Sequence, residues 1–68
     1  MTTTLSVNGK TLEYSGPTTL GALVDHLGIR RDGIAVAVND DVVPRAQLDV
    51  FAVRDGDAVE VIVAAAGG

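Results

Sequence analysis

The first fourteen residues carry an alternation of apolar and polar side chains that is interrupted once. Leu5 and Val7 precede the dipeptide Asn8-Gly9. Leu12 and Tyr14 follow that dipeptide with the same period of two. Such a period places alternate residues on one face of a β-strand, and Asn-Gly tolerates the positive φ angles of a two-residue turn. The segment therefore predicts a β-hairpin.

After the break at Ser15-Gly16-Pro17, the apolar positions change to a helical spacing of i, i+3, i+4 and i+7. Thr18 is suited to cap the first turn, because its hydroxyl can accept a bond from a free backbone N–H, and Gly28 favours a stop. We expect a short helix over about Thr19–Leu27. Gly21 inside it costs about 1 kcal/mol relative to Ala, so the helix needs to pack on a sheet. The apolar stripe comprises Leu20, Leu23, Val24 and Leu27.

Short β-branched runs dominate the second half of the chain. Ile34–Val38 is apolar on both faces, which is typical of a central strand. The next run ends at Pro44, which has no N–H to donate and so indicates an edge strand. The segment 45–49 suits one helical turn with Leu48 pointing inward, and the apolar segment 50–53 is ambiguous between strand and helix.

The last strand is expected at Ala58–Val63, where Val59, Val61 and Val63 share one face. Glu60 and Ile62 share the other. The predicted order of elements favours an α+β fold, with one mixed sheet and one helix across one of its faces.

Composition narrows the class of protein. A chain of 68 residues holds one domain. The five basic residues are scattered and the net charge is −4, which argues against a nucleic-acid partner. The absence of cysteine excludes disulfides, Cys-ligated metals and a thiol nucleophile. The apolar runs fall far short of the ~20 residues of a membrane span, and no basic leader is visible, so we expect a cytoplasmic protein that does not bind membranes.

The chemistry-bearing feature is the end of the chain, Gly67-Gly68, preceded by Ala64–Ala66. Glycine has no Cβ, so this segment could pass through a narrow channel in another protein. The five residues beyond Val63 reach at most ~17 Å when extended, enough to carry a terminal carboxylate to a remote active site. Taken alone, the dipeptide also fits an ordinary frayed end.

Six short motifs follow one another along nearly the whole chain: Val7-Asn8-Gly9, the helix Thr19–Leu27, Ala35–Asn39, Val43-Pro44-Arg45, Asp55-Gly56-Asp57 and Gly67-Gly68. In this order and spacing the chain resembles the ThiS-type sulfur carrier proteins of thiamine biosynthesis, in the ubiquitin-like β-grasp superfamily. The resemblance implies a β-grasp domain over 1–64, with four to five strands in a mixed sheet and one main helix across it. It also implies a flexible tail over 65–68, comprising Ala65, Ala66, Gly67 and Gly68.

The resemblance implies a function for Gly68. An E1-like adenylyltransferase of the ThiF type would use ATP and Mg²⁺ to adenylate its carboxylate. A sulfur donor, such as a cysteine desulfurase or sulfurtransferase, would then convert the terminus to a thiocarboxylate. A thiazole synthase of the ThiG type would receive that sulfur. The chain itself would bind no cofactor and would not be an enzyme.

Two alternatives remain at this point. The small subunits of molybdopterin synthase, and other Gly-Gly carriers such as protein-conjugating modifiers, share the fold and the tail. The molybdopterin subunits tend to be longer and to lack the Val-Asn…Val-Pro-Arg segment. The other alternative is a β-grasp binding module that is not a carrier and whose tail is inert.

A partner that takes the tail must also touch the body of the protein beside it. Ile62, with Glu60 on the same face of the last strand, is a candidate anchor for docking, although one exposed Ile is ordinary. Arg45 is a candidate for the rim, or simply a solvated loop residue. We interpret His26 and Arg30-Arg31 as solvated surface residues without a catalytic or metal-binding role.

Overall fold

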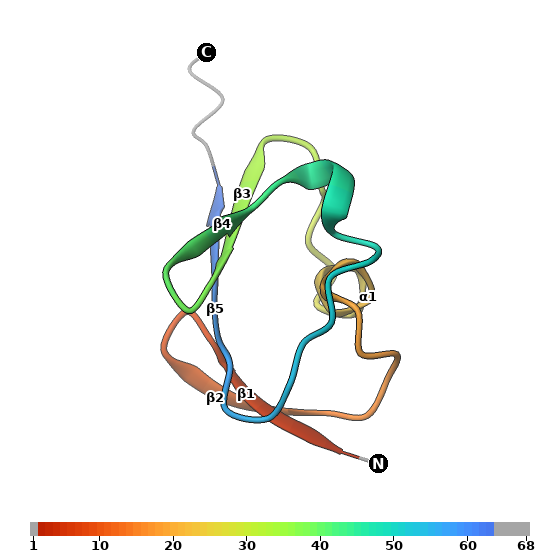
Figure 1. Ribbon diagram of the computed structural model, residues 1–68, viewed down its shortest axis with the longest axis vertical. Coiled ribbons are helices and arrows are strands. Elements are labelled where there is room, and N and C mark those ends of the chain that lie inside the picture. Colours follow the sequence, from red (N-terminus) through yellow and green to blue (C-terminus); the bar gives the residue numbers. More distant parts are fainter. Residues whose placement is uncertain (1, 64–68) are drawn as a thin grey trace.

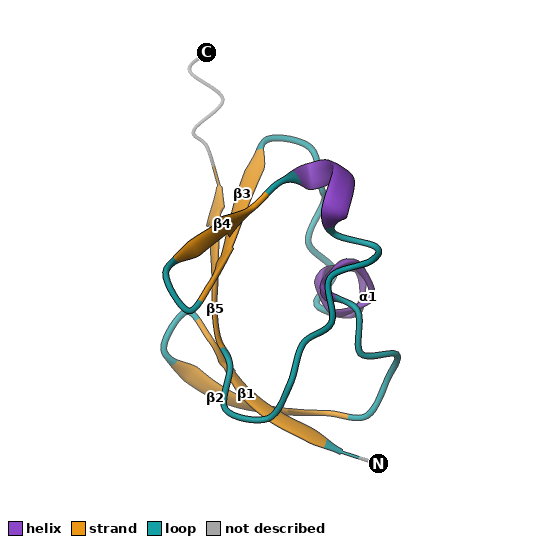
Figure 2. Ribbon diagram, viewed as in Figure 1, coloured by secondary structure: helices purple, strands orange, loops and turns teal. Residues whose placement is uncertain are grey.

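The computed structural model describes residues 2–63 and contains a five-stranded sheet in the order β2-β1-β5-β3-β4. β1 and β5 run parallel, and the other neighbouring pairs are antiparallel, so the sheet is mixed. The helix α1 lies to one side of the sheet, as Figures 1 and 2 show. The elements are β1 (Thr3–Val7), β2 (Lys10–Tyr14), α1 (Leu20–His26), β3 (Ile34–Val38), β4 (Asp41–Val43), a 3₁₀ turn η1 (Arg45–Gln47) and β5 (Ala58–Val63).

Two tight turns set the strand pairing. Asn8 and Gly9 have φ angles of 51° and 84°, which confirms the predicted hairpin turn between β1 and β2. Asn39 and Asp40, with φ angles of 52° and 72°, join β3 to β4 in the same way. Asn and Asp tolerate this left-handed region better than other non-glycine residues, so residue type decides both registers locally.

The core lies between the sheet and α1. The helical stripe supplies Leu20, Leu23 and Val24, all with no exposed surface, and the sheet supplies alternate residues of its strands. Removal of apolar surface from water at this contact is the main term that stabilises so short a helix. The buried apolar residues are Leu5, Tyr14, Leu20, Leu23, Val24, Val36, Val38, Val43, Leu48, Val53, Val59 and Val61.

The start of the helix differs from the sequence-based prediction. The N-cap is Thr19, whose hydroxyl accepts from the Ala22 N–H at 3.3 Å, and not Thr18. The carbonyl of Thr18 instead accepts from the Val53 N–H at 2.7 Å, which holds Thr18 against the loop before β5. The predicted stop is confirmed: Gly28 has a φ of 73°, and its N–H bonds the Asp25 carbonyl.

Three further predictions concern the second half of the chain. Ile34–Val38 is confirmed as an interior strand, with β5 and β4 on its two sides, while β5 takes the middle position because it also pairs with β1. The edge position of β4 is confirmed. So is the helical turn, with Leu48 only 2% exposed.

The ambiguous segment 50–53 passes beside α1 (Figure 1), where Ala52 forms an isolated bridge with Thr19, the N-cap of the helix. Across residues 2–63, no helix is long and apolar enough to span a membrane.

Candidate docking surface and tail exit

The exposed side of β5 carries the two residues that the alternation assigns to it. Ile62 is 55% exposed, and Glu60 is exposed on the same face. Across the strand pairing, Ile62 lies opposite Ala35 and Glu60 lies opposite Ala37. Val42, 73% exposed, lies opposite Ala37 on the other side.

These five residues of β5, β3 and β4 form what we term the outer face. It has an apolar surface with small side chains at Ala35 and Ala37, next to the carboxylate of Glu60. Because β3 contributes only Ala35 and Ala37 to this face, the longer side chains of Ile62 and Val42 project beyond it. Such a surface can accept an apolar partner side chain while Glu60 meets a basic one.

Val63 departs from the expected pattern. It shares its strand face with the buried Val59 and Val61, but it is 70% exposed. Val63 pairs with Ile34, the first residue of β3, so it lies at the end of the sheet. The predicted tail residues Ala65, Ala66, Gly67 and Gly68 lie outside the described residues.

Arg45 is tied down more than a solvated loop residue would be. Its Nη2 donates to the Arg31 carbonyl at 2.9 Å, and its Nη1 lies 3.9 Å from an Asp32 carboxylate oxygen. Its side chain is still 60% exposed. The hydrogen bond holds one side of the guanidinium, which leaves other N–H groups for a partner. The docking roles of Arg45, Glu60 and Ile62 stay predictions.

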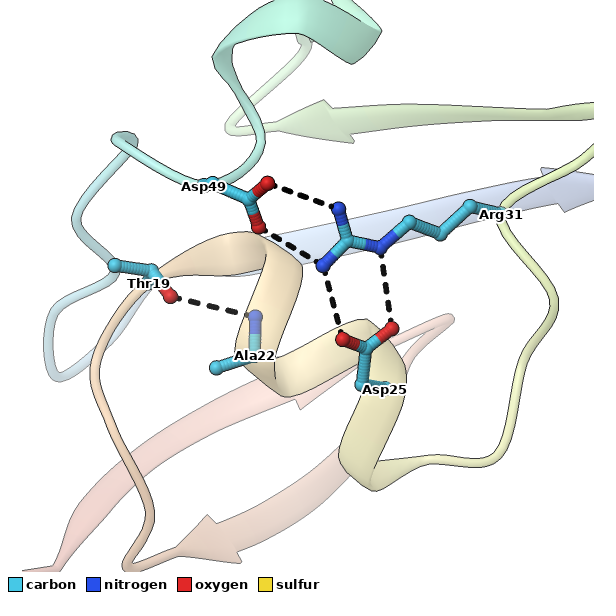
Figure 3. Close-up of polar contacts among 5 residues, drawn as sticks. All are labelled: Thr19, Ala22, Asp25, Arg31 and Asp49. Atoms are coloured by element: carbon cyan, nitrogen blue, oxygen red, sulfur yellow. Dashed lines mark hydrogen bonds and ion pairs between the residues drawn. The ribbon is translucent and has the colours of Figure 1, made fainter.

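The sequence pattern does not predict the interaction that holds the loop containing Arg31. Arg31 is not a free surface residue: its guanidinium forms paired hydrogen bonds to the carboxylates of Asp25 and Asp49 (Figure 3). The shortest nitrogen–oxygen distance is 2.9 Å to each carboxylate. Asp25 belongs to α1 and Asp49 follows η1, so this Arg31 clamp joins three segments. Its partners are six and eighteen positions away in the chain, and no local motif reveals them.

The Arg31 clamp shapes its own electrostatics. The hydrogen bonds that Arg31 donates to Asp49 and to Asp25, in that order of effect, raise the pKa of Arg31 above its ordinary value. In return, the hydrogen bond from Arg31 and its positive charge lower the pKa of the Asp49 carboxyl. Both shifts favour the charged forms of Arg31 and Asp49, so this pair is ionised at neutral pH.

Gly21 is explained by the same clamp. A Cβ at this position would overlap the Asp49 carboxylate and lie 2.7 Å from Arg31 Nη2 and 3.2 Å from the Leu48 carbonyl oxygen. The Gly21 N–H also donates to that carbonyl at 2.8 Å, and the Leu20 N–H donates to the Phe51 carbonyl. The loop backbone thus satisfies the first N–H groups of α1, and the absence of a Cβ at Gly21 leaves room for this close approach.

His26 is exposed, as predicted, but it is not isolated. Its ring lies 5.0 Å, centroid to centroid, from the buried ring of Tyr14 and is tilted by 54°. This geometry is typical of aromatic packing.

Among residues 2–63 no three His, Asp or Glu side chains gather as a metal site would need.

The chain matches the model of a known protein family. The model of the ThiS family matches residues 5–68, which spans the sheet, the helix, the outer face and the terminal Gly67-Gly68.

Two curated relatives are similar in sequence. The sulfur carrier protein ThiS of Escherichia coli is 33% identical over 61 residues, which cover 90% of this chain and 92% of that protein. A thiazole synthase of Paramagnetospirillum magneticum is 34% identical over 64 residues, covering 94% of this chain. The chain spans only about a fifth of the length of that synthase, 20%.

The fold is similar to that of solved structures. The crystal structure of the thiamine biosynthesis protein ThiS from Geobacter metallireducens has a TM-score of 0.81 and 32% identity, covering 96% of this chain and 99% of that one. A solution structure of a thiamine biosynthesis protein from the same organism has a TM-score of 0.76 and the same 32% identity, with 96% and 87% covered. The expected ubiquitin-like β-grasp architecture is confirmed.

Proposed function

This chain belongs to the ThiS family, and on that premise we propose that it carries sulfur on the carboxyl terminus of Gly68 for thiazole formation in thiamine biosynthesis. The observation that carries the proposal is a family match that runs to the last residue of the chain and includes Gly67-Gly68. As a member of a family of carriers it is a substrate of other enzymes and not an enzyme itself.

The chemistry follows from the weakness of a carboxylate as an acyl donor. The terminal carboxyl has a reference pKa of about 3.5 and is ionised at neutral pH. An E1-like adenylyltransferase of the ThiF type activates it with ATP and Mg²⁺: a carboxylate oxygen bonds to the α-phosphorus and pyrophosphate leaves. The terminal sulfur of a donor persulfide then attacks the acyl carbon, and AMP leaves. The chain and the donor are then joined by a sulfur–sulfur bond. A second thiol attacks the donor's own sulfur atom and forms a disulfide with it, and the thiocarboxylate leaves.

The donor of that sulfur is a cysteine desulfurase or a sulfurtransferase. This chain fits a recipient role, because it has no cysteine on which sulfur could be held. With no thiol to hold it, the sulfur is carried as an acyl derivative of the terminal carboxyl group.

A thiazole synthase of the ThiG type is the proposed acceptor. Support comes from the P. magneticum thiazole synthase, because a stretch covering 20% of that protein aligns with 94% of this chain. A carrier-like segment and a synthase within one polypeptide indicate that the two act on the same intermediate. This relationship favours thiazole formation over the molybdopterin alternative.

The folded domain provides the surface that partners bind. We place the docking contact on the outer face, with Ile62 as the apolar anchor, Glu60 as its acidic neighbour and Arg45 on the rim. Ile62 precedes the end of β5 by one residue, so a partner that holds the tail is also close to this side chain.

Intact-mass analysis of the native protein from sulfur-replete cells tests the proposal. We expect a fraction of the chains to be heavier by one oxygen-to-sulfur exchange at Gly68. Treatment with the purified adenylyltransferase, ATP and a sulfur donor should produce the same species. A matched variant without Gly68 should fold, as judged by its thermal unfolding, and stay unmodified. Equal modification of both proteins, or none of the full chain, would contradict the proposal.

A further inference from the structure

The parallel pairing of β1 with β5 ends before β5 does. β1 and β5 pair only at Ser6↔Ala58 and Val7↔Val59, whereas β5 continues along β3 to Val63. Beyond Val7 the chain turns away into the hairpin. The last residues of β5 therefore have a sheet neighbour on one side only.

The side chain of Asn8 closes the final rung of this pairing. The Asn8 N–H donates to the Val59 carbonyl at 2.9 Å, as in a regular parallel ladder. The next donor, the Val61 N–H, would then meet the main-chain carbonyl of Asn8. It bonds the side-chain Oδ1 of Asn8 instead, at 2.8 Å, because Asn8 has already entered the turn with a φ of 51°. The Asn8 side chain therefore supplies one hydrogen bond in place of the missing strand and no more.

The backbone direction along β5 identifies which groups are left over. Ala58 faces β3, since its carbonyl accepts from the Asn39 N–H and its N–H donates to Asn39 Oδ1. Val59 and Val61 face β1 through the bonds just described. By alternation, the Val61 carbonyl and the Val63 N–H also point to the β1 side. Within the described part of the chain this carbonyl accepts no hydrogen bond and this N–H donates none, because the pairing of β5 with β1 ends at Val59.

From these observations we infer that the Val61–Val63 edge of β5 takes up an extended segment of the adenylyltransferase, which pairs with it as an added strand. This inference rests on the proposed function. The chemistry of the edge selects its occupant: a free main-chain carbonyl and N–H at strand spacing are matched by another extended backbone. Exposed Ile62 and Val63 flank the edge on its two faces and can contact alternate side chains of the added strand.

Two features favour the enzyme over a second copy of this chain. The edge is only three residues long, and each copy carries a net charge of −4, so self-pairing is weak and repulsive. The edge also leads directly into residues 64–68, which the enzyme has to hold in order to adenylate Gly68. A strand that pairs at Val63 is already beside the start of the tail.

The variants Val63→Pro and Val63→Ala isolate the backbone contact. Both remove the valine side chain, but only proline also removes the N–H. Because that N–H points away from β3, the two variants should have similar thermal unfolding. We expect V63P to bind the purified adenylyltransferase roughly 2- to 12-fold more weakly than V63A, the effect of one backbone hydrogen bond. In the unsubstituted protein, the Val63 amide should exchange with deuterium more slowly in the complex.

Equal binding of V63P and V63A, or equal exchange of the Val63 amide in the free and bound states, would overturn the inference. Sulfur loading of the unsubstituted chain separates this failure from that of the proposed function. If loading proceeds while the two variants bind alike, only the added strand is wrong. If the unsubstituted chain never acquires sulfur, the proposed function is wrong and the inference falls with it.

Discussion

Replacement of Gly21 by alanine tests how the loop at Leu48 and Asp49 packs onto α1. The added Cβ has two opposed effects on the free energy of unfolding. In a helix interior, alanine is favoured over glycine by about 1 kcal/mol. Here the added Cβ would overlap the Asp49 carboxylate and crowd Arg31 Nη2 at 2.7 Å and the Leu48 carbonyl at 3.2 Å. Room for the Cβ requires the ends of the Asp49 and Arg31 side chains to move out of the clamp and the Leu48 backbone to shift, at a cost of about 1–3 kcal/mol. The balance predicts that G21A lowers the free energy of unfolding by about 1 kcal/mol.

Thermal and urea unfolding measure this change. For a domain of this size, about 1 kcal/mol corresponds to a fall in Tm of roughly 4–8 °C. Ala22→Gly calibrates the helix effect at the next position, where about 1 kcal/mol should be lost through propensity alone. In a background that carries Arg31→Met and Asp49→Ala, the side-chain overlap is gone and G21A should be close to neutral or stabilising. If G21A stabilises both backgrounds equally, the packing argument is refuted.

Three further substitutions test other parts of the structure. Ile62→Lys should slow sulfur loading by about tenfold without changing Tm, since a docking anchor is lost. Val50→Lys, also at an exposed apolar site (77%), is the control. Equal loading of both variants would show that Ile62 is not part of the interface. Leu48→Ala should cost about 2–5 kcal/mol in urea unfolding, because the side chain is 2% exposed; a change below 1 kcal/mol would contradict its place in the core. The Arg31 clamp lowers the pKa of Asp49 below its reference value of 3.8, so the carboxylate stabilises the fold above that pH, and this contribution disappears as the pH falls through the lowered folded-state pKa. Asp49→Asn should therefore be less stable than the unsubstituted chain at pH 7, with a difference that vanishes in strong acid; a difference independent of pH would show that the charge plays no part.

Local residue patterns determined most of the secondary structure. The alternation on each side of Asn8-Gly9 specifies the first hairpin, because a period of two and a turn that accepts positive φ act within a few residues of each other. The helical spacing that starts at Leu20 and the stop at Gly28 are equally local. The exposure of Ile62 also follows from alternation once one face of β5 is buried. The tail motif is visible in the sequence alone.

Only the tertiary structure decided how these elements meet. The middle position of β5 depends on its parallel pairing with β1, which lies some fifty residues earlier in the chain. The Arg31 clamp and the need for Gly21 depend on a loop from elsewhere in the chain that approaches the start of α1. The free edge at Val61–Val63 exists because the end of β1 pairs with the start of β5, and β1 turns into the hairpin after Val7 while β5 continues to Val63. Period and propensity describe neighbours along the chain, whereas these contacts arise between segments that become neighbours only when the apolar faces are buried together.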